Sequence, residues 1–169
     1  MERVFPMRYF LTFVCYGSRL HGEAGAVDRN HNLPGSPTLA PEPEWVERET
    51  ELMDQPPYLM DEGDRAVVLE AIREVCAYRG WLLLAAHVRT NHVHVIVEAE
   101  DKPEKVMNDF KRYASRNVSR SGSGEPGRKR WARQGSTRYL WKDEDVKEAV
   151  RYVVEEQGTP MAVFCAEGI

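Results

Sequence analysis

The sequence has few cysteines, no long hydrophobic run and no internal repeat, and each absence excludes a class of protein. Its three cysteines, Cys15, Cys76 and Cys165, are scattered and form no Cys-x-x-Cys pair. They predict reduced thiols in a cytoplasmic protein rather than a disulfide framework or a zinc knuckle. No apolar run approaches the roughly 20 residues needed to cross a bilayer, so no membrane partner is expected. The lack of a repeat excludes solenoids and propellers.

The chain of 169 residues, 42% hydrophobic and 30% charged, predicts one globular domain over residues 1–169. Its formal net charge of −4 hides an asymmetry, because acidic residues dominate between Glu42 and Glu74 and basic residues dominate over 111–138. A basic block on an otherwise acidic protein is typical of a surface that binds a polyanion. We therefore expect nucleic-acid binding, with a solvated surface that has no partner as the alternative. The basic residues are Lys111, Arg112, Arg116, Arg120, Arg128, Lys129, Arg130, Arg133 and Arg138.

Hydrophobic periodicity and turn signals predict an α+β fold. The predicted strands cover residues 8–16, 81–88, 91–97 and 137–141, and the predicted helices cover 61–78, 104–120 and a final segment that begins at 143. Apart from the final helix, this order matches a ferredoxin-like antiparallel sheet with helices packed on one face. Residues 19–57, rich in glycine and proline, predict a long irregular insertion after the first strand. Residues 119–136 predict a basic flexible segment.

One short stretch of the sequence carries most of the chemical signal, the heptapeptide Asn-His-Val-His-Val-Ile-Val at residues 91–97. Side chains of a strand alternate between two faces, so His92 and His94 are expected on one face and the valines on the other. Two imidazoles one pleat apart can bind a divalent metal if a third ligand comes from elsewhere. Two half-buried structural histidines are the alternative.

The helix predicted over residues 104–120 supplies further candidates. Tyr113 and Asn117 are four residues apart, so they lie one turn apart, at the border between the apolar stripe and the charged side. A deprotonated tyrosine at such a border can attack a phosphorus that a metal polarises. Arg112, Arg116 and Arg120 on the same helix would hold flanking phosphates. A border aromatic that only anchors its helix is the alternative for Tyr113.

The segments Asn-His-Val-His-Val-Ile-Val (91–97) and Phe-Lys-Arg-Tyr-Ala-Ser-Arg-Asn (110–117) resemble those of the single-tyrosine HUH endonucleases. More narrowly, they look like those of the REP-associated tyrosine transposases and other IS200-like transposases. In that family a His-hydrophobic-His strand and a polar residue four positions after the nucleophilic tyrosine bind the metal. The resemblance therefore implies Tyr113 as the nucleophile and His92, His94 and Asn117 as metal ligands.

The same resemblance implies an activity and partners. It implies an endonuclease that cuts single-stranded or hairpin DNA with Mg²⁺ or Mn²⁺ and leaves a 5′-phosphotyrosine and a free 3′-hydroxyl. Attack by another 3′-hydroxyl reseals the ester, which gives strand transfer. A homodimer is compatible, because in some relatives the tyrosine helix reaches the partner's site. The alternative is a non-catalytic nucleic-acid-binding protein on the same fold. A histidine-triad hydrolase does not fit, because its third histidine would fall at Ile96.

Overall fold

The computed structural model describes residues 5–18, 53–122 and 127–169. The described elements follow in the order β1 (Met7–Cys15), α2 (Glu62–Arg79), β2 (Leu82–Val88), β3 (His92–Ala99), α3 (Pro103–Arg120), β4 (Trp131–Tyr139), α4 (Asp143–Glu155) and β5 (Ala162–Cys165). The strands form one antiparallel sheet in the order β4-β1-β3-β2-β5. The predicted α+β class with an antiparallel sheet is confirmed.

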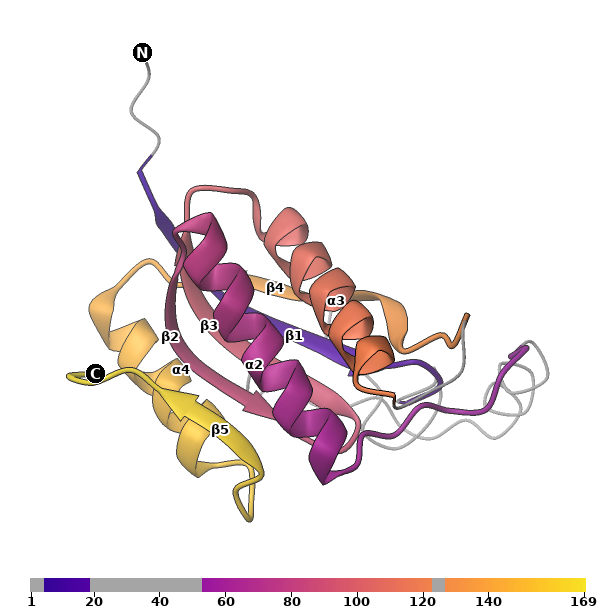
Figure 1. Ribbon diagram of the computed structural model, residues 1–169. Helices are drawn as coiled ribbons and strands as arrows, with labels where there is room; N and C mark the ends of the chain where they lie inside the picture. Colours follow the sequence, from indigo (N-terminus) through magenta and orange to yellow (C-terminus); the bar gives the residue numbers. More distant parts are fainter. Residues whose placement is uncertain (1–4, 19–52, 123–126) are drawn as a thin grey trace.

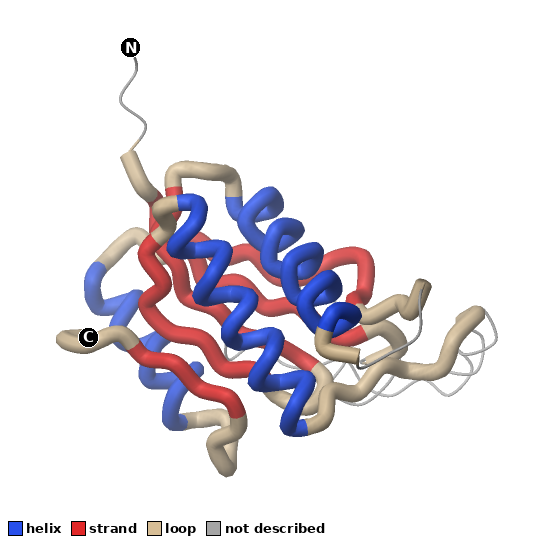
Figure 2. The backbone as a smooth tube through the Cα atoms, viewed as in Figure 1, coloured by secondary structure: helices blue, strands red, loops and turns tan. Residues whose placement is uncertain are grey.

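Helices cover both faces of the sheet (Figures 1 and 2). Helices α2 and α3 lie side by side over one face, and α4 lies over the other. Helices α2 and α3 thus share a face, as the ferredoxin-like pattern predicts, and α4 forms a layer of its own. Among the described residues, no helix is both long enough and apolar enough to cross a membrane.

The observed elements differ from the predicted ones mainly at the edges of the sheet. Helix α3 ends at Arg120, as predicted, but strand β4 begins at Trp131, inside the segment 119–136 that was expected to be flexible. Strand β5 was not predicted at all. Strands β4 and β5 are the two edge strands, and their side chains are at most half-buried. Neither therefore carries the apolar alternation of a central strand. Of the irregular insertion expected at 19–57, residues 19–52 lie outside the described part of the chain.

Strand β3 lies between β1 and β2 and contributes to two separate hydrophobic cores. Val93, Val95 and Val97 are 0% exposed and belong to the core beneath α2 and α3. Ile96 is also 0% exposed, but it belongs to the core beneath α4. Since neighbouring side chains of a strand point to opposite faces, His92 and His94 share the α4 side with Ile96.

Strand β4 passes close to β1 and α3 at Gly135. A β-carbon at this position would lie 2.5 Å from the Thr12 carbonyl oxygen and 2.7 Å from the Met107 sulfur. The methionine side chain can move, but the Thr12 carbonyl is part of the neighbouring strand and is fixed. Glycine is therefore required here by close packing.

We expect Gly135→Ala to lower the free energy of unfolding by about 1–3 kcal/mol, because the added methyl group forces β4 away from β1. Urea denaturation measures this. Gly63→Ala is the matched control, since a β-carbon there would meet only the Asp61 Oδ1 atom at 3.4 Å, in the first turn of α2. Alanine favours helix, so the control is expected to be unchanged or more stable. Equal destabilisation of both variants would contradict this account.

Lys111 attaches α3 to β4. Its side chain is buried, and Nζ donates hydrogen bonds to the carbonyl oxygens of Ala132 (3.0 Å) and Gln134 (3.4 Å). Burial lowers the pKa of Lys111 to about 8. This placement corrects the prediction that Lys111 binds DNA, because an ammonium group that is enclosed between a helix and a strand does not reach a phosphate in solvent.

The lowered pKa of Lys111 predicts a specific pH dependence. Between about pH 8 and the ordinary lysine pKa of 10.5, the unfolded chain binds more protons at this residue than the folded chain does. Raising the pH through this window should therefore stabilise the wild type relative to Lys111→Met, by roughly 1–2 kcal/mol. Urea denaturation of both proteins at about pH 7.5 and pH 9.5 measures the difference. A difference that stays constant between the two pH values would refute the proposed burial of the charge.

Candidate functional site

His92 and His94 lie next to each other near the start of β3. Their ring centroids are 4.8 Å apart, and both rings lie on the face of the sheet that α4 covers. His94 is 5% exposed and packs against Phe10 of β1, with 5.5 Å between ring centroids. The structure thus confirms that the two imidazoles project from one face. The valines between and after them fill the opposite core.

Each histidine ring is oriented by a hydrogen bond at Nδ1. His92 Nδ1 lies 2.8 Å from the Asn91 side-chain oxygen, and His94 Nδ1 lies 2.8 Å from the Thr12 hydroxyl. An amide oxygen only accepts, so His92 Nδ1 carries the proton and Nε2 is the nitrogen that would bind a metal. Thr12 lies directly opposite His94 on the neighbouring strand, so sheet pairing fixes the second contact. Hydrogen bonds of this kind orient metal-binding histidines.

The donor set fits part of a metal site. Neutral imidazoles bind divalent metals, whereas Mg²⁺ and Mn²⁺ favour oxygen, so an oxygen ligand has to complete the set. In the part of the chain that the structure describes, no group of three or more His, Cys, Asp or Glu side chains converges to hold a metal ion. The two histidines therefore provide a preorganised pair that needs a further ligand.

The structure does not bring Tyr113 and Asn117 to the histidines. Tyr113 packs against the core beneath α2 and α3, and the guanidinium carbons of Arg112 and Arg116 lie 5.6 Å and 4.6 Å from its ring centroid. Asn117 donates a hydrogen bond to Glu74 of α2 at 3.2 Å. The sheet separates both residues from the histidine pair. Helical spacing predicts which residues share a helix face, but not which face of the sheet that helix covers.

A different tyrosine lies beside the histidines, Tyr152 of α4. Its ring centroid is 5.7 Å from that of His94 and 6.1 Å from that of Phe10, and the side chain is half-buried. The buried stripe of α4, formed by Val146, Ala149, Val150 and Val153, seats this helix on the histidine face. Tyr152 lies at the border of that stripe, where its ring contacts His94 and Phe10.

Tyr152 was not predicted as a site residue, although the sequence contains a signal for it. Glu156 follows Tyr152 by four residues, which is the same tyrosine-to-polar spacing that singled out Tyr113 and Asn117. The Glu156 amide donates to the Tyr152 carbonyl at 3.2 Å, and its carboxylate lies 3.5 Å from Arg151 Nε. Both tyrosines lie on amphipathic helices with similar patterns, so only the position of each helix in the fold separates them.

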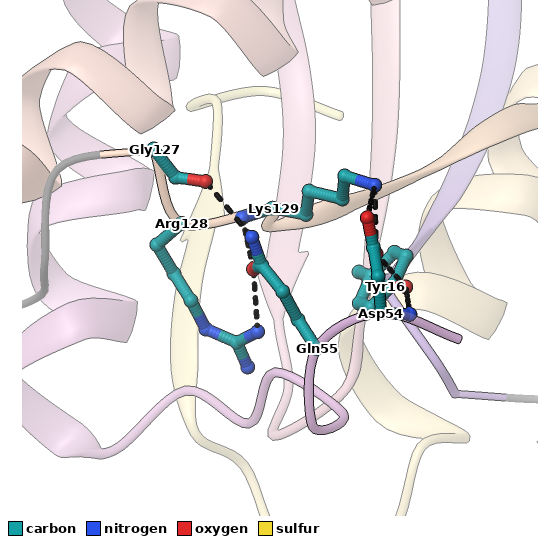
Figure 3. Close-up of polar contacts among 6 residues, drawn as sticks. All are labelled: Tyr16, Asp54, Gln55, Gly127, Arg128 and Lys129. Atoms are coloured by element: carbon teal, nitrogen blue, oxygen red, sulfur yellow. Dashed lines mark hydrogen bonds and ion pairs between the residues drawn. The ribbon is translucent and has the colours of Figure 1, made fainter.

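The basic residues before β4 are engaged with the segment that precedes α2 (Figure 3). Lys129 forms an ion pair with Asp54 at 2.7 Å, and this contact lowers the pKa of the Asp54 carboxyl and raises that of Lys129. Gln55 accepts hydrogen bonds from Arg128 Nη1 (3.0 Å) and the Lys129 amide (2.8 Å), and it donates to the Gly127 carbonyl (3.0 Å). These cations hold two distant chain segments together, which accounts for part of the basic block without a ligand.

The remaining basic residues fall into three groups. Arg130 is buried, with its guanidinium carbon 5.8 Å from the Tyr58 ring centroid. Burial is the main reason that the pKa of Tyr58 is raised to about 12. Exposed arginines on α3 are Arg112, Arg116 and Arg120, and Arg133 is exposed in β4. Arg138 pairs with Phe10 across β1 and β4, so it lies on the histidine face.

A family model matches this chain. The model for IS200-like transposases matches residues 55–156, more than half of the chain. The matched region extends from the segment before α2 through α4. It therefore includes the two histidines as well as Tyr113, Tyr152 and Glu156.

Two solved structures are similar in fold. A REP-associated tyrosine transposase bound to a REP hairpin aligns with a TM-score of 0.50 and 13% sequence identity, over 92% of this chain and 69% of that one. A candidate transposase from Deinococcus radiodurans aligns with a TM-score of 0.46 and 15% identity, over 93% of this chain and 95% of that one. At 13% identity, the similarity to the hairpin-bound transposase concerns the fold alone.

No curated protein sequence matches this chain. The family model nevertheless spans most of the described domain, from α2 through α4. The antiparallel sheet with helices on both faces is also the fold of the hairpin-bound transposase. The chain therefore belongs to the IS200-like transposase family.

Proposed function

We propose that this protein is a metal-dependent single-stranded DNA endonuclease and strand transferase in which Tyr152, not Tyr113, is the nucleophile. The observation that carries the proposal is the position of the Tyr152 ring, 5.7 Å from the His94 ring on the same face of the sheet. Family membership supports a transposase-like reaction on DNA. The contact between the tyrosine helix and the histidine strand supplies the two parts of the site within one chain.

His92 and His94 would hold the metal through Nε2, with their rings fixed by Asn91 and Thr12. We assign the third ligand to Glu156, because it follows Tyr152 by four residues, as the metal-binding polar residue does in the family. In this structure the Glu156 carboxylate lies beside Arg151 and not with the histidines, so it would have to turn toward them when a metal binds. A carboxylate also adds the oxygen donor that Mg²⁺ and Mn²⁺ favour and that two imidazoles lack. When bound, either ion would polarise the scissile phosphate as a Lewis acid.

The proposed reaction needs no cofactor other than the metal ion. The Tyr152 hydroxyl loses its proton and its oxygen bonds to the scissile phosphorus, while the bond from phosphorus to the 3′-oxygen breaks. The departing 3′-oxygen takes up a proton and becomes a free hydroxyl, and the 5′-phosphate stays on Tyr152 as an ester. Attack of another 3′-hydroxyl on that ester reverses the step and joins a new strand. Packing of the Tyr152 ring against Phe10 and His94 limits its motion during both steps.

Single-stranded or hairpin DNA is the proposed partner. The structural neighbour bound to a REP hairpin supports a hairpin substrate. Of the predicted DNA-binding residues, Arg138 is on the histidine face, where it can contact a phosphate near the scissile one. Arg112, Arg116 and Arg120 are exposed on α3, on the other side of the sheet, and would contact more distant parts of the DNA, as would the exposed Arg133 of β4.

We expect Tyr152→Phe to abolish the covalent protein–DNA adduct, because phenylalanine has no hydroxyl to form the ester. The measurement uses a labelled hairpin oligonucleotide with Mn²⁺, followed by denaturing electrophoresis. Tyr113→Phe is the matched control, since it removes the same atom from the other face of the sheet, and its adduct yield should equal that of the wild type. Loss of the adduct in Tyr113→Phe with retention in Tyr152→Phe would reverse the assignment and indicate that Tyr113 of a second copy reaches the site.

Removal of one imidazole tests the metal site. His92→Ala should weaken Mn²⁺ binding, measured by isothermal titration calorimetry, by about 100-fold or more and abolish cleavage. Salt-dependent DNA binding, measured by fluorescence anisotropy, should change little, because the arginines remain. Normal Mn²⁺ binding by His92→Ala would show that His92 is not a metal ligand. A wild type that binds DNA but forms no adduct would instead support the non-catalytic alternative.

A further inference from the structure

The structure assigns a positioning role to His87, which we propose holds the C-terminal end of α4, and with it Tyr152, in place on the sheet. This inference rests on the proposed role of Tyr152 as the nucleophile. His87 lies on β2, directly opposite His94 of β3, and its side chain is 0% exposed. It is neither a proposed metal ligand nor a DNA contact.

Both ring nitrogens of His87 bind backbone groups of other elements. Nδ1 lies 2.8 Å from the Val153 carbonyl oxygen, so it must donate, because a carbonyl only accepts. The amide of Met161 donates to Nε2 at 3.0 Å, so Nε2 must accept. Only the neutral ring with its proton on Nδ1 satisfies both contacts. Burial lowers the pKa of His87, which favours this neutral form.

The Val153 carbonyl is in the last turn of α4, which ends at Glu155. Carbonyl groups in the last turn of a helix have no amide four residues further along the helix, so they need another donor. His87 supplies this donor from the sheet and thereby caps the helix. Val153 is the residue after Tyr152, so the hydrogen bond acts on the backbone that carries the proposed nucleophile.

The turn that follows α4 is attached to the same strand end. Arg89 Nη1 donates to the Thr159 carbonyl at 2.6 Å, and the same nitrogen lies 3.5 Å from His87 Nε2. Met161 immediately precedes β5, which pairs with β2 through Val88 and His87. His87 and Arg89 thus join the end of α4, the turn and β5 to β2, and His94 is paired to the same β2 position.

This arrangement fixes the separation of Tyr152 from the histidine pair. His94 and His87 are held opposite each other by strand pairing, and His87 holds the helix end by one hydrogen bond. An apolar residue could fill the space of the His87 ring, but it would leave the Val153 carbonyl and the Met161 amide without these contacts. Displacement of a nucleophile by about 1 Å can reduce a rate by about 100-fold, so this single contact can control the reaction.

Three substitutions of His87 separate positioning from general packing. In His87→Asn, the amide nitrogen is two bonds from Cβ, as Nδ1 is, so it can still donate to Val153. In His87→Gln, the amide is one bond further out, near the place of Nε2, so it can contact Met161 but not Val153 in the same way. His87→Leu removes both contacts and keeps an apolar side chain of similar size.

The test measures the rate of adduct formation at saturating hairpin DNA, the DNA dissociation constant and the hydrogen exchange of the Met161 amide. We expect His87→Leu to form the adduct about 10- to 100-fold more slowly, with a DNA dissociation constant within about 2-fold of the wild type. His87→Asn should recover most of the rate, and His87→Gln should not. In His87→Leu and His87→Asn, the Met161 amide should exchange faster than in the wild type, since neither side chain has an acceptor at the position of Nε2.

A wild-type rate in His87→Leu would overturn the inference. If that variant does not fold, the comparison of the other two decides, and a His87→Gln rate equal to or above that of His87→Asn overturns it. A wild-type protein whose adduct does not depend on Tyr152 would overturn the proposed nucleophile and, with it, this role of His87. Slow adduct formation by His87→Leu beside a normal Tyr152-dependent wild-type adduct supports both.

Discussion

The two-sided burial of β3 is the constraint on which the rest of the structure depends. The strand is central in the sheet, and its valines fill one core while Ile96 fills the other. A one-residue shift of register would exchange the two faces, place imidazoles in the core beneath α2 and α3, and move the valines to the α4 side. The position of His92 and His94 is therefore set by the hydrophobic effect acting on their neighbours. The polar site exists because the apolar residues around it have only one good arrangement.

The same burial determines which polar groups can take part in chemistry. His87, Lys111 and Arg130 are all buried, and each uses its polar atoms or its ring contacts to join elements of the fold. Their presence in the interior requires such partners, because an unpaired buried polar group costs free energy. The half-buried Tyr152 and the exposed arginines differ, because part of each side chain is accessible to solvent and can contact a ligand.

Helix α4 and strand β5 supply the second half of the proposed site. Helix α4 and strand β5 follow the region with the strongest sequence signal, yet they lie beside it in space because β5 pairs with β2. This pairing adds to the hydrogen bond from His87 to the Val153 carbonyl and to the packing of Val153 on the Ile96 core, which also hold the end of α4 near His94. The last strand is short and half-buried, so its importance lies in its position and not in the area it buries.

The sequence by itself determined the α+β class, most helix and central-strand positions, and the two histidines on one face, because these depend on periodicity along the chain. It did not determine which of Tyr113 and Tyr152 lies beside the histidines. Both are border tyrosines on amphipathic helices with a polar residue four positions later, and nothing local to either helix records which face of the sheet it covers. Only the tertiary structure decided this, because the packing of α3 on the valine core and of α4 on the Ile96 core places one tyrosine away from the histidines and the other beside them.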